Sequence, residues 1–164
     1  MALDTSVIGK PTGAHRVTVE RGPVSNFARA IKDENPVYRD PAAARAAGFA
    51  DIPAPPTWAF AMQYWGRYAE DQPDDPTGGT NPMQQVMGEL FAKGGLVLHG
   101  EEEFEYHRPI VVGDVLVGEG RIVDLYEKES KGRTMTFVVT ETVWRDEKSG
   151  EVAVTERFNV LHRS

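Results

Sequence analysis

The stretch that most constrains this chain covers residues 51–71 and reads DIPAPPTWAFAMQYWGRYAED. Its prolines exclude a helix from the first part, because each one pushes the residue before it toward extended geometry. From Thr57 to Asp71, large apolar side chains cover nearly the whole circumference of a helix. A helix that is apolar on so many sides is usually enclosed by other structure. We therefore predict a buried central helix, Thr57 to Asp71, that the rest of the chain wraps.

Length, charge and composition narrow the class of protein. A chain of 164 residues fits one compact domain, residues 1–164, that buries roughly 70% of its unfolded surface. The central helix is too short for a membrane span, which takes roughly 20 apolar residues. A net charge of -7 argues against binding to nucleic acid and to anionic membranes. The absence of cysteine excludes disulfides and thiolate metal sites.

The first residues show no secretory pattern. MALDTSVIGK lacks a basic region followed by an apolar core, so we expect a cytoplasmic protein. After a loose segment to about Gly13, alternation predicts a short strand over residues 15–20. Pro23 fits the first turn of a helix whose apolar residues recur at helical spacing, and this helix should end near Asp33.

Further breaks divide the middle of the chain. Asp40 and the proline after it indicate the start of a second short helix, residues 42–47, closed by Gly48. Residues 72–82 are rich in turn formers and lack apolar periodicity, so we expect an exposed loop there. The segment 83–93 fits a short helix, but its pattern is ambiguous.

Beyond residue 96 the pattern changes to long strands separated by glycine turns. Alternation predicts strands over residues 103–107, 115–126, 134–144 and 152–161. In the third of these, the side chains of one face are Met135, Phe137, Val139 and Val143, opposite a row of threonines. In the fourth, the aligned apolar residues are Val152, Val154, Phe158 and Val160.

Helices followed by a meander of strands give an α+β architecture. A long antiparallel sheet that curls around one very apolar helix buries both elements, which is the arrangement of a single hotdog fold. The edge strands of such a sheet tend to be covered or paired, so we expect a dimer that continues the sheet. Another helix-on-sheet α+β domain is the alternative.

The second set of observations concerns the residues DENPVY at positions 33–38. They resemble the MaoC-like (R)-specific enoyl-thioester hydratases and 3-hydroxyacyl-thioester dehydratases, whose catalytic motif reads Asp-x-Asn-Pro-aliphatic-His. Asp33, Asn35, Pro36 and Val37 match that motif, whereas Tyr38 stands where the family has its histidine. A tyrosine, with a reference pKa of roughly 10, is a poor base at neutral pH.

The second half of the chain resembles the N-terminal, FAS1-like dehydratase halves of the same group. The residues that carry this resemblance read LHGE at 98–101 and EFEYHRP at 103–109, with Gly-Asp at 113–114. Because the motif histidine is missing, the chain is similar to the non-catalytic subunits of actinobacterial heterodimeric (3R)-hydroxyacyl-thioester dehydratases. In those proteins one hotdog supplies the His/Asp pair and the other shapes the acyl channel.

Three residues are candidates for catalysis, and each has a structural alternative. Asp33 could end a helix and cap a turn, and Tyr38 could be a packed aromatic residue. His99 is the strongest substitute base by residue type, although a partly buried structural histidine is the commoner case. The substrate-binding candidates are Asn35, Pro56, Thr57, Trp58 and Gly100. At the start of the central helix, free backbone N–H groups could polarise a thioester oxygen.

Three functions fit these residues. The chain could be a subunit that binds an acyl-CoA or acyl-carrier-protein thioester and completes a dehydratase with a His/Asp-bearing hotdog partner. It could be an active homodimeric hydratase with an altered site. It could also be a non-catalytic hotdog protein that binds acyl-CoA. The expected chemistry needs no metal, flavin or nicotinamide cofactor, and no motif for one is present.

Overall fold

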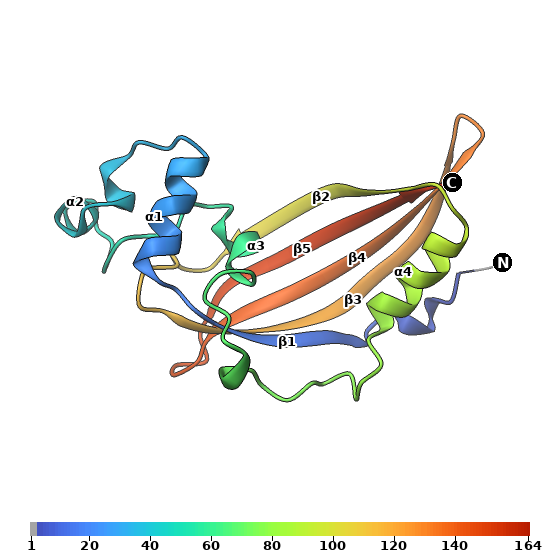
Figure 1. Ribbon diagram of the computed structural model, residues 1–164, viewed down its shortest axis with the longest axis horizontal. Helices are drawn as coiled ribbons and strands as arrows, with labels where there is room; N and C mark the ends of the chain where they lie inside the picture. Colours follow the sequence, from blue (N-terminus) through green and yellow to red (C-terminus); the bar gives the residue numbers. More distant parts are fainter. Residues whose placement is uncertain (1–2) are drawn as a thin grey trace.

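A strongly curved antiparallel sheet forms the body of the molecule in the computed structural model, which describes residues 3–164 (Figure 1). Its strands lie in the spatial order β1-β3-β4-β5-β2, so β1 and β2 are the edges. The strands are β1 (Pro11–Thr18), β2 (Leu96–Tyr106), β3 (Val115–Ser130), β4 (Arg133–Asp146) and β5 (Val152–Arg163). The sequence therefore predicted the four strands of the second half correctly, and each is longer than expected.

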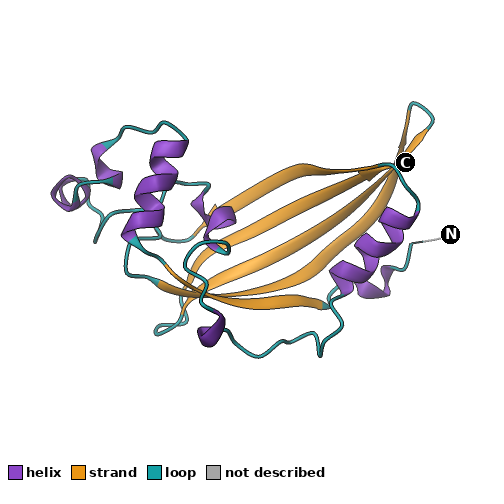
Figure 2. Ribbon diagram, viewed as in Figure 1, coloured by secondary structure: helices purple, strands orange, loops and turns teal. Residues whose placement is uncertain are grey.

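The helices lie at the two ends of the sheet and across its inner face (Figure 2). The α-helices of the described residues are α1 (Arg21–Ala30), α2 (Pro41–Ala46), α3 (Trp58–Met62) and α4 (Pro82–Ala92). Single 3-10 turns are η1 (Thr5–Val7), η2 (Pro36–Tyr38) and η3 (Ala69–Asp71). The predictions for α1 and α2 are confirmed, and the ambiguous segment before residue 93 is helical. No helix within residues 3–164 is long and apolar enough to cross a membrane.

The central helix is much shorter than predicted. α3 ends at Met62, whereas the sequence predicted a helix that continues to Asp71. Gly66 shows why, because its φ is +74° and its carbonyl oxygen accepts a hydrogen bond from the Thr18 amide at 2.9 Å. A β-carbon at Gly66 would overlap the Thr18 carbonyl oxygen. This close approach to β1 turns the chain out of the helix, and the prediction was wrong beyond Met62.

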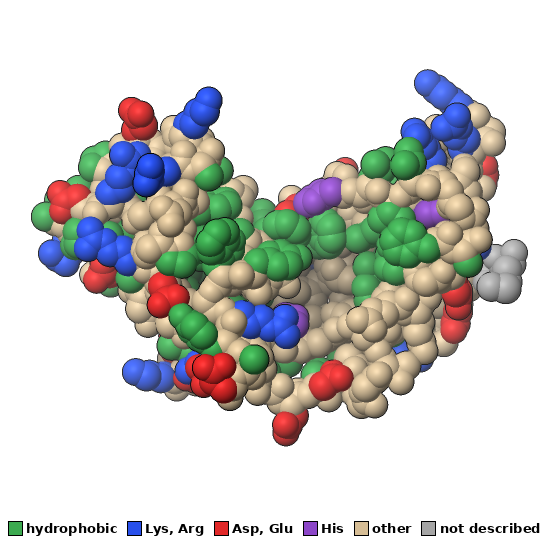
Figure 3. Space-filling model, in the orientation of Figure 1, with side chains coloured by type: hydrophobic (Ala, Val, Ile, Leu, Met, Phe, Trp, Pro, Cys, Tyr) green, Lys and Arg blue, Asp and Glu red, His purple; other side chains and the backbone are tan. Residues whose placement is uncertain are grey.

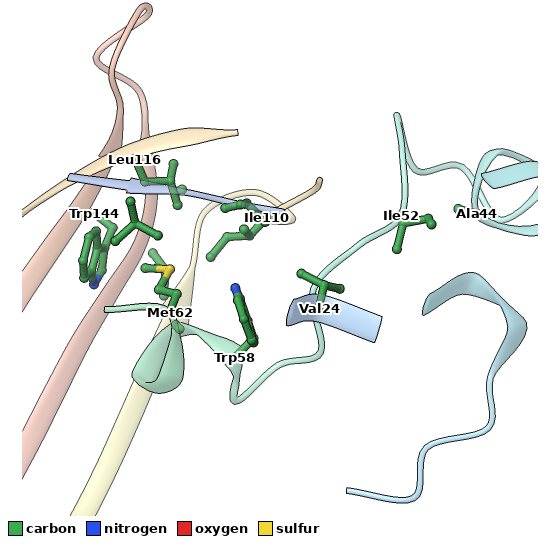
Figure 4. Packing of buried hydrophobic residues seen from close by; sticks show 13 residues of the cluster. Val24, Ala44, Ile52, Trp58, Met62, Ile110, Leu116 and Trp144 are labelled. Carbon is green, nitrogen blue, oxygen red and sulfur yellow. The ribbon is translucent and has the colours of Figure 1, made fainter. Parts of the chain in front are cut away.

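The enclosed part of the central stretch is α3 itself. Trp58 and Met62 are buried and point toward Leu116 and Trp144 of the sheet (Figure 4). The aromatic residues after α3 lie in solvent instead, with exposed fractions of 73% for Tyr64 and 50% for Trp65. Only the first turns of the predicted helix therefore occupy the core.

The inner face of the sheet is defined by its register. Trp144 pairs with Val154 and Val138 with Val160, and all four side chains are buried. Even-numbered residues of β4 and β5 thus face the helices. The threonines of β4 lie on this inner face, whereas the apolar row that includes Phe137 lies on the outer face, where Phe137 stacks on Tyr126 at 4.8 Å between ring centroids.

The core consists of two apolar clusters separated along the sheet. The first joins α1, α2 and α3 to one end of the sheet through Val24, Ala44, Trp58, Met62, Leu116, Trp144 and Val154. The second joins α4 to the other end through Val86, Leu90, Ile122, Leu125, Val138 and Val160. Between the clusters, the inner face of β4 and β5 carries Thr140, Thr142, Glu156 and Phe158. This middle belt is more polar than the two clusters, and the space-filling view is hollowed over the middle of the sheet (Figure 3).

Candidate functional site

Residues 33–38 form the turn that follows α1. The helix ends as Lys32 adopts a φ of +59°, and the Asp33 amide then donates to the Ala28 carbonyl at 2.9 Å. The Asp33 carboxylate accepts a hydrogen bond from the Asn35 amide at 2.9 Å. The Asn35 side chain in turn accepts from the Val37 amide at 3.1 Å and caps η2. Both side chains therefore stabilise the turn, which is the alternative to a role in the site.

The carboxylate of Asp33 lies close enough to Tyr38 to affect the pKa of its hydroxyl. Partial burial, followed by the negative charge of Asp33, raises the pKa of the Tyr38 hydroxyl above its usual value. A phenol shifted in this direction stays protonated at neutral pH and cannot act as a base. The structure thus brings Asp33 and Tyr38 together without giving Tyr38 the chemistry of the histidine in the family motif.

His99 lies elsewhere, on the inner face of the edge strand β2. Its ring packs against Phe158 at 4.6 Å and Phe60 at 5.6 Å between centroids. Its Nε2 atom is 3.6 Å from a carboxylate oxygen of Glu102, which is longer than a hydrogen bond. No contact among the described residues joins His99 to Asp33 or Tyr38. The three catalytic candidates therefore do not form one cluster within this chain.

Gly100 forms a β-bulge that sets the direction of its neighbours. The β2–β5 register shifts between His99 and Glu101, so His99 and Glu102 both face inward although they are three residues apart. A β-carbon at Gly100 would lie 2.8 Å from the Asn159 carbonyl oxygen. Gly100 thus gives β2 this close approach to β5 and positions His99.

The residues at the start of α3 differ in their exposure and in the backbone groups that they leave free for a ligand. Trp58 is buried, packs edge-on against Phe27 at 5.5 Å between centroids, and uses its amide to bond the Pro55 carbonyl at 2.9 Å. Pro56 has no amide hydrogen, and its carbonyl accepts a bond from the Tyr106 hydroxyl. Thr57 is exposed, so its amide is the remaining candidate for a polarising donor.

A pair of carboxyl groups, Glu102 and Glu156, was absent from the sequence-based candidates. β2 and β5 pair Glu102 with Phe158 and Phe104 with Glu156, which makes the two glutamates diagonal neighbours on the inner face. Glu156 is only 5% exposed and accepts a hydrogen bond from the Trp144 indole at 3.2 Å. Burial, and then the hydrogen bond and charge of Glu156, raise the pKa of Glu102 to about 8. Burial also raises the pKa of Glu156. Glu102 is therefore mainly protonated at neutral pH.

One sequence signal pointed to this pair. Glu156 is in phase with Val154, Phe158 and Val160, which the sequence aligned on one apolar face of the last strand. A carboxylate in phase with a buried row is rare unless it is paired. Its partner across the sheet could not be identified, because that requires the register of β2 after its bulge.

The described residues hold no group of three or more His, Asp or Glu side chains that could bind a metal ion. The groups that the candidate residues present are carboxyl, imidazole and phenol groups and a backbone amide. Such groups can donate and accept protons and can polarise a carbonyl.

A curved sheet around a short buried helix, with an Asp-x-Asn-Pro turn beside it, defines a MaoC-like hotdog protein. The chain belongs to the family described as FAS1-like, dehydratase domain region, whose family model matches residues 6–156. The α+β hotdog prediction and the resemblance stated from the sequence are thereby confirmed.

Similar proteins support this assignment. A UPF0336 protein of Streptomyces avermitilis is 35% identical over 167 residues, which cover 100% of this chain and 97% of that relative. A probable enoyl-CoA hydratase alpha subunit of Thermomonospora curvata is 34% identical over 144 residues, 84% of this chain but 43% of the relative. Among solved structures, the ChsH1-ChsH2 complex from Mycobacterium tuberculosis matches with a TM-score of 0.72 and 25% identity, over 93% of this chain and 83% of that one.

Proposed function

We propose that this chain is a subunit of a (3R)-hydroxyacyl-thioester dehydratase or (R)-enoyl-thioester hydratase that a His/Asp-bearing hotdog partner completes. One observation carries the proposal: Tyr38 replaces the motif histidine beside an Asp33 that caps its own turn. Dehydration needs a base for the proton alpha to the thioester carbonyl and an acid for the leaving hydroxyl. A protonated phenol beside a carboxylate lacks the histidine half of that pair.

The free edge of β2 supports a partner subunit. β2 is paired on one side only, by β5, so its other backbone edge is open within this chain. Large apolar residues on β2 and after α3 are exposed at 40% or more: Tyr64, Trp65, Leu96 and Leu98. Open strand edges and clustered exposed apolar residues are both typical of surfaces that bind another protein. A partner strand added along β2 would continue the sheet.

The comparisons favour the same arrangement. One relative is described as an alpha subunit, and one structural match is a complex of two different chains. The substrate we propose is an acyl-CoA or acyl-carrier-protein thioester. In this arrangement the partner supplies the acid–base pair, and this chain contributes the wall formed by α3 and the inner face of the sheet.

The test is copurification from the native host, followed by hydration assays with crotonyl-CoA on the chain alone and on the complex. We expect turnover by the complex and none by the chain alone. We also expect Tyr38→Phe to leave the activity of the complex unchanged, because the phenol does no proton transfer. Robust hydration by the isolated chain would contradict the proposal.

One observation favours a second candidate function, an active homodimeric hydratase with an altered site. His99 lies 3.6 Å from Glu102, whose carboxyl group is a proton donor at neutral pH. Imidazole and carboxylic acid are suitable base and acid groups. Under this alternative, the purified chain hydrates crotonyl-CoA and His99→Ala or Asp33→Ala abolishes the activity. Tight acyl-CoA binding with no turnover in any combination would instead indicate a binding protein.

A further inference from the structure

A cavity of about 340 Å³ lies between β1, the segment after Gly66 and the loop that leads into α4. Its lining includes His15 of β1, Arg67, Asp75 and Gln84. Gln72 also lines it and is hydrogen-bonded to the backbone of Arg16 in β1. Basic and histidine side chains gather in the hollow over the sheet (Figure 3). This cavity is separate from the turn at residues 33–38, and the proposed function gives it no role.

His15 presents an unsatisfied nitrogen within this region. It pairs with Gly118, which in turn pairs with Trp144, so the imidazole lies on the inner face of the sheet. Its Nδ1 atom is buried and has no hydrogen-bond partner among residues 3–164. Burial, and then the positive charge of Arg67, lower the pKa of His15, so the ring is neutral at pH 7. A buried polar atom without a partner is unfavourable, so the ring is held in an environment that the described residues leave incompletely satisfied.

Arg67 forms no ion pair with a carboxylate of the described residues, unlike several arginines of the sheet. Arg16, Arg108 and Arg157 each form an ion pair with Asp or Glu. The backbone before Arg67 is fixed, because the Gly66 carbonyl is bonded to the Thr18 amide. In a chain with a net charge of -7, this is an unneutralised guanidinium held beside a histidine.

The acidic residue of the cavity does not neutralise Arg67. Asp75 accepts hydrogen bonds from the amide and the hydroxyl of Thr77 and from the Gly79 amide. These bonds hold the pKa of Asp75 below its usual value and keep its carboxylate turned to its own loop. Arg67 and His15 are the other two titratable residues that line the cavity.

We propose that this cavity binds an oxyanion, a phosphate or a carboxylate group of a ligand, between the Arg67 guanidinium and the His15 imidazole. A guanidinium binds either group through two parallel N–H donors. The anion also favours protonated His15, which then donates to it. Binding is therefore coupled to the uptake of a proton by His15. The site does not depend on the dehydratase assignment.

The test is NMR of the His15 ring protons during titration of the purified chain with inorganic phosphate, and separately with acetate, at constant ionic strength. We expect a saturable shift and a higher His15 pKa in the bound state. Arg67→Gln should weaken binding at least tenfold, and Arg67→Lys should weaken it less. Arg45→Gln is the matched control, because Arg45 is an exposed arginine on α2, outside the cavity.

The two anions distinguish the possible ligands. Saturation by phosphate alone identifies a phosphate ester, saturation by acetate alone identifies a carboxylate, and saturation by both identifies a general oxyanion site. Absence of a saturable shift with either anion would overturn the proposal. An equal loss of affinity in Arg45→Gln and Arg67→Gln would also overturn it, since binding would then follow net charge.

Discussion

Glu102 and Glu156 lie diagonally across β2 and β5, and the indole of Trp144 donates a hydrogen bond to Glu156. Two ionised carboxylates in this position would repel each other at low dielectric. The raised pKa of Glu102, about 8, keeps this carboxyl mainly protonated at neutral pH and removes that repulsion. Loss of this proton at higher pH therefore destabilises the folded state but not the unfolded state.

The first prediction is that the stability of this protein decreases as pH rises from about 4.5 to about 8. The pKa of Glu102 is raised from 4.5 to about 8 in the folded state, so the folded chain binds more protons than the unfolded chain across this range. Glu102→Gln should reduce this dependence, although Glu156, whose pKa burial also raises, still contributes to it. The substitution should stabilise the protein by about 1–3 kcal/mol at pH 8. Urea unfolding at pH 5 and pH 8 measures both effects.

Glu103→Gln is the control for that experiment. Glu103 is the neighbouring residue, but its side chain is 70% exposed and lies beside Arg157 on the outer face. We expect the pH dependence to persist in this variant. An unchanged slope in Glu102→Gln would show that Glu102 does not titrate with a raised pKa.

The second prediction concerns the turn that ends the central helix. Gly66→Ala should destabilise the protein by about 3 kcal/mol, because it combines a positive φ with steric overlap at the Thr18 carbonyl. Gly79→Ala is the matched control, since Gly79 has a φ of +86° but open space around its β-carbon position. Its cost should be about 1 kcal/mol. Thermal unfolding of both variants tests the difference, and equal losses would contradict it.

The third prediction separates capping from catalysis in the turn after α1. Asn35→Ala should cost about 1 kcal/mol in urea unfolding, because η2 loses the hydrogen bond to the Val37 amide. Asp33→Ala should cost a similar amount through its bond to the Asn35 amide. Glu34→Ala, between them, is the control and should be neutral. Under the proposed function, none of the three changes the turnover of the complex by more than about twofold; a large loss with unchanged stability would assign them to the site.

The fourth prediction restores the family motif. Tyr38→His places an imidazole beside Asp33, where its carboxylate can orient the ring and stabilise its charged form. Because the wild-type chain alone is expected to be inactive, we expect the purified variant to hydrate crotonyl-CoA at about 10² times the rate without protein. Tyr38→Phe should show no gain. Failure of Tyr38→His to gain activity would mean that residues beyond positions 33 and 38 also separate this chain from active hydratases.

Most of the fold could be predicted from local sequence patterns. Period-two alternation and the glycine turns gave four strands in the correct order, and the motif at residues 33–38 gave the family. The length of the central helix was wrong because the interaction that ends it is tertiary. Gly66 breaks the helix through its approach to Thr18, and nothing in residues 57–71 alone shows that Thr18 is near.

The candidate site was predictable only where it is local. Asp33, Asn35 and Tyr38 are close in sequence, and the structure keeps them close. The juxtaposition of Glu102 and Glu156 depends on the register between β2 and β5, which are not consecutive in the chain. The choice of the threonine face of β4 as the inner face depends on where the helices pack. Apolar content alone favoured the opposite face of β4, because Phe137 and its neighbours lie outside.

The β-bulge at Gly100 determines what a one-residue deletion or insertion in β2 would do to the side chains of that strand. Upstream of Gly100, odd-numbered β2 residues such as His99 face inward; downstream, even-numbered ones such as Glu102 do. Deleting Gly100 would restore unbroken alternation along β2. One half of the strand would then turn its inward-facing side chains to the outer face and its outward-facing side chains to the inner face. A single codon thus decides which side chains the edge strand presents to the interior.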